Sequence, residues 1–291
     1  MRTLGVLLAA AVALGGCGPS GDDRREATVD ATPAAAFDGA DYADEAAKTA
    51  HGKRLATTLF ACNACHGKDY AGRNFGEMIP LVEGLWASNI SRSMPTMNDA
   101  KLERVLREGV YPDREIYLMP SKQTQFLSKR DMAALIAFLR TIPSVGEPTP
   151  LPPKGFEEAV RARLPKDYWL TEQERKTGSY ANAAEEVAYH ADHQPPDLGP
   201  GLARGRMIAV SICSSCHGAA LDGVGEPAGD IQGALAYDDN AFDRLLVHSI
   251  DRTGKQVSVE WGFGHEAQPL TVAERRDAVA YVRALARSRA R

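Results

Sequence analysis

The pattern of hydrophobic and polar positions predicts helices, and it predicts a similar set twice. Residues 99–110 and 239–250 each place apolar side chains three and four positions apart, which is the spacing of one face of an amphipathic helix. A further helix follows each of them, preceded by Ser128–Asp131 in one case and by Thr271–Glu274 in the other, and both segments have the form of a capping box. The apolar stripes of these last helices are Met132, Leu135, Ile136 and Leu139, and Ala278, Val282 and Leu285. We therefore expect an all-α protein whose two parts share one plan.

The composition allows two ordinary domains. A chain of 291 residues is long enough for two cores, and 44% hydrophobic and 25% charged residues are ordinary values for a globular protein. The formal net charge of -4 argues against a nucleic-acid-binding protein. The proline-rich stretch 142–156 cannot continue a helix or a sheet, so it predicts a semi-rigid spacer between the two parts.

A strongly apolar run lies at the N-terminus, at Leu4–Gly16. It is too short for a comfortable membrane span and predicts a secretory signal. Its end, Leu14–Cys17, resembles a bacterial lipobox, which implies cleavage before Cys17 and acylation of its sulfur. The alternative is a plain signal peptide with this cysteine as a stray thiol. We expect residues 1–16 to be the signal peptide and residues 17–43, which are poor in core-forming side chains, to be a flexible lipid-anchored tether.

Four of the five cysteines lie in two copies of Cys-x-x-Cys-His, at residues 62–66 and 213–217. Two pairs of cysteines could form one four-thiolate zinc site, but that site would leave both histidines without a role. A redox-active dithiol is a second possibility, although no strand is predicted before either copy, where such folds place one. The third is haem attachment, in which each cysteine sulfur adds to a vinyl group and the neighbouring histidine ligates the iron from one face. The spacing favours the third, because two thioethers at one haem edge place the next residue beneath the iron.

With its helices and its two motifs, the chain resembles the mono-haem, mainly helical c-type cytochromes, present here in tandem. Both motifs follow a glycine, a basic residue and an apolar helical stretch, within His51–Gly67 and Ala203–Gly218. The resemblance implies two covalently bound haem c groups, the first held by Cys62, Cys65 and His66 and the second by Cys213, Cys216 and His217. It predicts cytochrome c domains at residues 44–142 and 199–291, joined by a linker at 143–198.

The sixth ligand of the iron is expected to differ between the two parts. In the family this group is usually a methionine in the loop before the last helix, and Met119, followed by Pro120, occupies that loop in the first part. Its rivals are Met78, Met94 and Met97. No methionine occurs after Met207, and the corresponding loop of the second part contains His265. His265 is therefore the first candidate there, while His248, the pair His190 and His193, and an open or water-ligated iron stay open.

Two covalently held haems on a lipid-tethered exported protein predict an electron carrier with no catalytic residues of its own. Methionine ligation raises the reduction potential relative to two histidines, so electrons would enter at the second haem and leave through the first. The expected partners are redox proteins on the periplasmic side of the cell envelope: a membrane-associated dehydrogenase or respiratory complex as donor, and an oxidase or soluble cytochrome as acceptor. The alternative is a di-haem enzyme, similar to peroxidases or thiosulfate dehydrogenases, that uses an open or unusually ligated second haem, with Glu266 as a candidate acid.

Overall fold

The computed structural model describes residues 35–37, 42–163, 182–223, 229–257 and 264–291. The predicted signal peptide, Cys17 and most of the predicted tether lie outside these residues. All elements named below belong to one compact unit, Pro33–Arg291. Among the described helices, none has the length and apolar character needed to cross a membrane.

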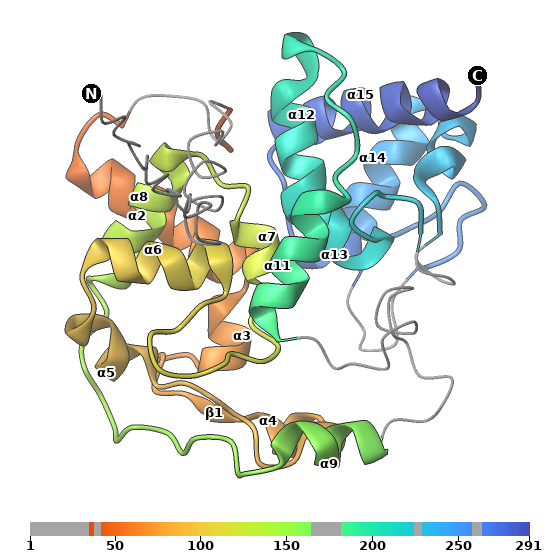
Figure 1. Cartoon of the computed structure of the whole chain (residues 1–291). Coiled ribbons are helices and arrows are strands. Elements are labelled where there is room, and N and C mark those ends of the chain that lie inside the picture. The colour runs from red at the N-terminus through yellow and green to blue at the C-terminus, as the bar shows by residue number, and fades with distance from the viewer. Residues whose placement is uncertain (1–34, 38–41, 164–181, 224–228, 258–263) are drawn as a thin grey trace, which may run out of the picture. The chain divides into compact units, whose positions relative to one another are not determined.

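The first half of this unit is mainly helical, as predicted (Figure 1). Its helices are α2 (Glu45–Arg54), the π-helix η1 (Leu55–Leu59), α3 (Cys62–His66), α4 (Phe75–Met78), η2 (Pro80–Val82), α5 (Ile90–Ser93), η3 (Met94–Thr96), α6 (Asp99–Glu108), α7 (Ser121–Thr124) and α8 (Lys129–Leu139). Two very short strands, β1 (Arg73–Asn74) and β2 (Trp86–Ala87), pair with each other in antiparallel orientation. The sequence pattern did not predict this hairpin.

The second half repeats much of this order. Its helices are η4 (Pro200–Leu202), α12 (Ala203–Ile208), the π-helix η5 (Ala209–Cys213), α13 (Ser214–His217), η6 (Ile231–Ala236), α14 (Asp239–His248), η7 (His265–Ala267) and α15 (Val272–Arg289). The segment between the halves contributes α9 (Phe156–Arg163) and α11 (Ala183–Asp192). The predicted all-α fold with two similar helical domains is confirmed.

In each half the first long helix crosses the last one at a glycine. Gly52 of α2 lies against α8, and Gly205 of α12 lies against α15, and both crossings can be followed in Figure 1. A Cβ atom on either glycine would overlap a carbonyl oxygen of the facing helix, that of Ala134 or that of Asp277. Glycine is needed at these two positions because only a residue without a Cβ lets the backbones approach so closely.

Both last helices begin at the predicted caps. In the second half Thr271 and Glu274 form a complete capping box, in which the Glu274 carboxylate accepts from the Thr271 backbone N–H at 2.7 Å. In the first half the Ser128 hydroxyl caps the Asp131 N–H at 3.0 Å, but the carboxylate of Asp131 takes other partners. It bonds the ring of His51 at 2.8 Å and the hydroxyl of Ser128 at 2.8 Å. The first capping box that we predicted is therefore only half formed.

A short segment before α2 belongs to the core. Phe37 has no exposed surface, and its ring lies edge-on to Phe60 with the ring centres 6.0 Å apart. Its backbone N–H donates to the buried carboxylate of Asp131 at 3.1 Å. The prediction that the tether runs to residue 43 is wrong at this end, because Ala36 and Phe37 pack as part of the fold.

The two halves share their main hydrophobic core. Fully buried side chains of the first half, such as Leu55, Leu59 and Leu135, lie in one cluster with side chains of the second. The second-half members are Met207, Ile208, Ile212 and Ala278. Burying a side chain of this size stabilises a fold by about 1.5–3 kcal/mol, so the shared cluster ties the halves together. A separate cluster around Leu221, Tyr281 and Leu285 lies within the second half.

The connecting segment is bound to both halves. The side-chain amide of Asn89 holds its proline-rich part by donating to the carbonyls of Val145 and Glu147 at 2.8 and 2.9 Å. Further along, α11 packs against α6 and α7 of the first half. Beyond α11, the Tyr281 hydroxyl of the second half donates to the Pro196 carbonyl at 2.8 Å. The segment is therefore part of the packed unit along both described stretches.

Candidate haem sites

The first Cys-x-x-Cys-His motif is reached through a π-helix and one left-handed residue. The π-helix η1 ends at Leu59, and Ala61 has φ 44° immediately before α3 begins at Cys62. A single turn of helix then carries both cysteines and His66. π-Helices are rare and frequently lie at functional sites.

The backbone after this motif turns tightly and fixes the orientation of His66. Gly72 donates from its backbone N–H to the carbonyl of His66 at 2.9 Å, and its own φ is 88°. The Nδ1 atom of His66 lies 2.7 Å from the carbonyl oxygen of Ser88, which follows β2. Nδ1 is therefore the donor, and Nε2 is left as the ligating atom. Burial lowers the pKa of His66 against the opposing effect of the Ser88 bond, which favours the neutral form that binds a metal.

The second motif repeats this geometry. Gly223 donates to the carbonyl of His217 at 2.9 Å and has φ 88°. The Nδ1 atom of His217 lies 2.7 Å from the carbonyl oxygen of Gly229, as His66 does from Ser88. The same turn and the same fixed imidazole occur twice, which indicates that both motifs serve the same purpose.

The state of the cysteines argues against the two alternatives to haem attachment. Burial raises the pKa of Cys62 and of Cys213 to about 12, with a further contribution from the second cysteine of each motif. A reactive dithiol needs the opposite shift, because the thiolate is the nucleophile. No disulfide joins the four motif cysteines, and the described residues contain no group of three or more Cys, His, Asp or Glu placed to hold a metal ion. A four-thiolate zinc site is therefore not assembled.

Met119 lies at the edge of the main core in the loop that leads to α7. Its half-buried side chain packs against the cluster that also contacts Cys62. Two of its rivals, Met94 and Met97, are buried in that cluster, and their carbonyl oxygens accept from Arg140, the residue after α8, at 2.6 and 2.7 Å. These two methionines are core residues of a segment held by Arg140, while Met119 stays the predicted ligand.

The structure brings His265 of η7 to the second motif. The ring centres of His217 and His265 are 6.2 Å apart, and the two ring planes differ by 28°. An iron bound to a nitrogen of each ring at about 2 Å, the usual length of an imidazole–metal bond, would hold the ring centres about 6 Å apart. Burial lowers the pKa of His265 to about 4, and His217 contributes to that shift while Glu266 opposes it. His265 is therefore neutral at pH 7, as a ligand must be.

The other candidate histidines are placed differently. His248 is exposed at the end of α14, and His193 is exposed with its Nδ1 2.8 Å from the Tyr189 carbonyl. His190 is buried in α11, where burial, then Lys122, then His193 lower its pKa to about 3. None of these three rings is recorded in contact with His217.

Two buried polar atoms beside the motifs have no partner among the described residues. They are the hydroxyl of Tyr70, whose pKa burial and the Cys62 thiol raise to about 12, and Nδ1 of His265. Buried polar groups normally have a hydrogen-bond partner, so these atoms fit a group that the protein itself does not supply. The donor set of two thiols and one fixed imidazole at each motif fits haem in the same way.

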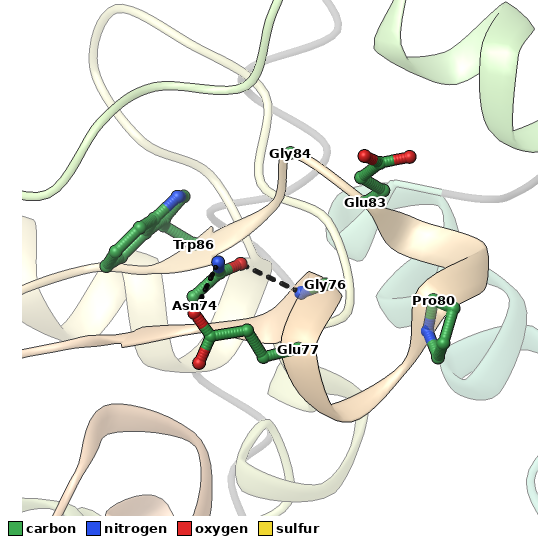
Figure 2. A pocket seen from close by; sticks show the side chains of 7 residues that line it. All are labelled: Asn74, Gly76, Glu77, Pro80, Glu83, Gly84 and Trp86. Carbon is green, nitrogen blue, oxygen red and sulfur yellow. Dashed lines mark hydrogen bonds between the residues drawn. The ribbon is translucent and has the colours of Figure 1, made fainter.

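A separate surface pocket of about 440 Å³ lies beside the β1–β2 hairpin (Figure 2). Figure 2 shows Asn74 bonded to the Gly76 N–H and to Glu77, with Trp86 on the opposite strand. The pocket is lined by Asn74, Gly76, Glu77, Pro80, Glu83, Gly84 and Trp86. It contains no residue of either motif, so it is distinct from the candidate haem sites.

Two helical domains, each presenting a Cys-x-x-Cys-His turn with its imidazole fixed through Nδ1, define a haem-binding protein of the c type. The family model for Cytochrome c matches residues 49–143 and 202–286, and the chain belongs to the cytochrome c family. Membership implies covalently bound haem c and a role in electron transfer. No curated protein and no solved structure gives a significant match.

Proposed function

We propose that this cytochrome c carries two haems of unequal potential and passes electrons between them as an exported electron carrier. Haem iron, when bound, supplies the one-electron couple. Cys62, Cys65 and His66 hold the first haem with Met119 as sixth ligand, and Cys213, Cys216 and His217 hold the second with His265. Methionine ligation raises the potential relative to bis-histidine ligation, so electrons enter at the second half and leave through the first.

The observation that carries this proposal is the pair of rings in the second half. The ring centres of His217 and His265 lie 6.2 Å apart, a distance suited to one iron between the two rings. Hydrogen bonds hold both segments: the Gly229 carbonyl lies 2.7 Å from Nδ1 of His217, and the N–H of Glu266, next to His265, donates to the Ser249 hydroxyl at 3.3 Å. Two protein ligands leave no open position for a substrate, which favours a carrier over the alternative of a peroxidase-like or thiosulfate dehydrogenase-like enzyme.

The shared core supports transfer within the molecule. Ile212, one residue before Cys213, packs in the same cluster as Leu59, three residues before Cys62. The two attachment segments are thus joined by packed side chains within one unit rather than by the linker alone.

Low-temperature electron paramagnetic resonance of the oxidised holoprotein tests this ligation. We expect two low-spin signals, and a redox titration should resolve two potentials. Met119→Ala should convert the first signal to high spin and His265→Ala the second, while His248→Ala, which changes an exposed histidine of the same half, should alter neither. A high-spin signal from the unmodified second half would favour the enzyme, and peroxide and sulfur substrates would then be assayed.

We further propose that the protein acts on the periplasmic side of the cell envelope, anchored by lipid on Cys17. A membrane-associated dehydrogenase or respiratory complex would be its donor, and an oxidase or soluble cytochrome its acceptor. The support is the apolar run at Leu4–Gly16 followed by the lipobox-like Leu14–Cys17. Cys17→Ser should release the protein from the membrane fraction without loss of haem, and retention in that fraction would contradict the anchor.

A further inference from the structure

The loop that carries His265 is attached to the first half. Three residues after His265, the side-chain amide of Gln268 donates to the carbonyl of Leu59 at 2.8 Å. Leu59 closes the π-helix η1, three residues before the first haem-attachment cysteine. Leu270, two residues further on, packs against the main core that Leu59 also joins. The segment that follows η7 in the ligand loop therefore packs directly against the first half.

The same loop ends at an ion pair between the halves. Glu274, with a side chain that is 1% exposed, accepts two hydrogen bonds from the guanidinium of Arg54, at 3.0 and 2.6 Å. Its carboxylate also accepts from the Thr271 backbone N–H, where the loop becomes α15. A paired arginine and carboxylate with two parallel bonds fixes distance and orientation together. Arg54 thus fixes the point at which the loop joins its helix.

The first half holds its own ligand loop from within. Arg107 of α6, which is buried, donates to the carbonyls of Gln125 and Leu127 at 2.9 and 2.7 Å. The buried acid at the start of α8, Asp131, likewise has partners inside the first half, including His51 at 2.8 Å. In the second half the loop carbonyl of Leu270 accepts from Arg275 of α15 at 2.8 Å, but the arginine on the buried acid comes from α2 of the first half.

We propose that Arg54 and Gln268 are positioning residues for the sixth ligand of the second haem, so that the first half sets the ligation of the second. This inference rests on the proposed role of His265. Two contacts with the first half hold the loop: the ion pair of Arg54 with Glu274, and the hydrogen bond from Gln268 to the Leu59 carbonyl. On its other side Gly264 meets Ser249 at the end of α14. Release of the first-half contacts leaves the α14 side and Arg275, which donates to the Leu270 carbonyl at 2.8 Å, to hold His265 opposite His217.

The test uses the full-length oxidised holoprotein and cyanide, which binds ferric haem where an axial position is free. Arg54→Met should raise the affinity of the second haem for cyanide about tenfold, the size of an ordinary coupling between sites, and increase its high-spin fraction. The signal of the first haem should stay unchanged. Arg54→Lys keeps the charge but not the forked geometry, so it should restore the affinity only in part.

Arg204→Met is the matched control. Arg204, about as exposed as Arg54, pairs with Asp277 on the same helix α15 at 2.5 Å, but both residues belong to the second half and Asp277 is 25% exposed where Glu274 is 1% exposed. Its loss should leave the cyanide affinity at the wild-type value. Because removal of Arg54 leaves Glu274 buried without its counter-charge, Gln268→Ala serves as the milder second variant and should raise the affinity in the same direction.

The outcomes separate the inference from the function beneath it. If His265→Ala leaves the spectra unchanged, His265 is not the ligand and the proposed function fails together with this inference. If His265→Ala opens the second haem but Arg54→Met and Gln268→Ala bind cyanide as the unmodified protein does, the inference alone is overturned. Equal effects of Arg54→Met and Arg204→Met would also overturn it, because they would reflect a general loosening of α15.

Discussion

The two halves of this cytochrome c agree closely around the iron-binding turn and differ around the loop of the sixth ligand. The imidazoles of His66 and His217 each lie 2.7 Å from a backbone carbonyl. In each half an arginine also binds the first residue of the middle helix: Arg140, the residue after α8, binds Asp99, and Arg283 of α15 binds Asp239. What is repeated is therefore the attachment of haem and the packing of its helices. What changes is the group on the far side of the iron, which sets the potential.

The difference between the halves extends to how independent each is. Asp131 and Glu274 occupy matching positions in the first turn of the last helices, and both are fully buried. Asp131 takes its partners within the first half, whereas Glu274 takes Arg54 from the other half. The connecting helix α11 covers α6 and α7 of the first half. The first half is thus the more self-contained, and the second depends on it.

The largest expected effect tests the feature that the halves share. Gly52→Ala and Gly205→Ala each place a Cβ onto the backbone of the facing helix, which cannot move aside as a side chain could. We expect each to lower the free energy of unfolding by about 3 kcal/mol or more, measured by denaturant titration with circular dichroism. Gly201→Ala is the control, because a Cβ there meets nothing within 4 Å, and it should change stability by less than about 0.5 kcal/mol.

The two variants also test whether the halves unfold together. Because they share a core, we expect either substitution to shift one common transition. Separate transitions for the two haems would show that the halves are independent, contrary to the comparison above.

The repeated features are those that sequence could predict. The motifs are recognised by residue identity, and the helices α6 and α14 by apolar periodicity. The hairpin was missed because strands of two residues are too short to show an alternating pattern. The carbonyls of Ser88 and Gly229 carry no signal either, since any residue supplies a carbonyl.

Contacts between distant segments account for the rest of what was missed. Arg54 and Glu274 are 220 positions apart, and nothing local to either residue indicates its partner. Phe37 lies in a stretch rich in alanine and aspartate, and one aromatic residue there gives no periodic signal of burial. The burial of His51 depends on Asp131 of another helix in the same way.

An intermediate effect on stability is expected at acidic pH. It comes from α11, the connecting helix that packs against the first half. His190 in α11 has its pKa lowered to about 3, mainly by burial, from the value near 6.5 of an exposed histidine. Between about pH 6.5 and about pH 3, His190 is therefore protonated in the unfolded chain but neutral in the folded chain. The free energy of unfolding falls as the pH drops through this range. At pH 5 this loss amounts to about 2 kcal/mol, because 1.36 kcal/mol corresponds to one pKa unit.

His190→Gln should remove this part of the pH dependence. Denaturant titrations at pH 7.5 and pH 5 give the difference, which should be smaller in the variant by about 2 kcal/mol. His248→Gln changes an exposed histidine of the second half and should leave the difference as it is. An identical pH dependence in all three proteins would mean that His190 titrates normally in the fold.

The smallest effect concerns a point where the halves differ before the haem motif. Ala61 has φ 44° and ψ 41°, whereas Ile212, the matching residue before Cys213, lies within the π-helix η5. The left-handed backbone crowds the Cβ of alanine, and glycine adopts it without that crowding. Ala61→Gly should therefore raise the free energy of unfolding by about 0.5–1 kcal/mol, seen as a higher midpoint with an unchanged slope in a denaturant titration.

Ala64→Gly, in the right-handed turn of α3, should lower the free energy of unfolding by about as much, because glycine there only adds freedom to the unfolded chain. Equal losses at both positions would mean that the first motif is entered without strain, and the two halves would then approach their haems in the same way.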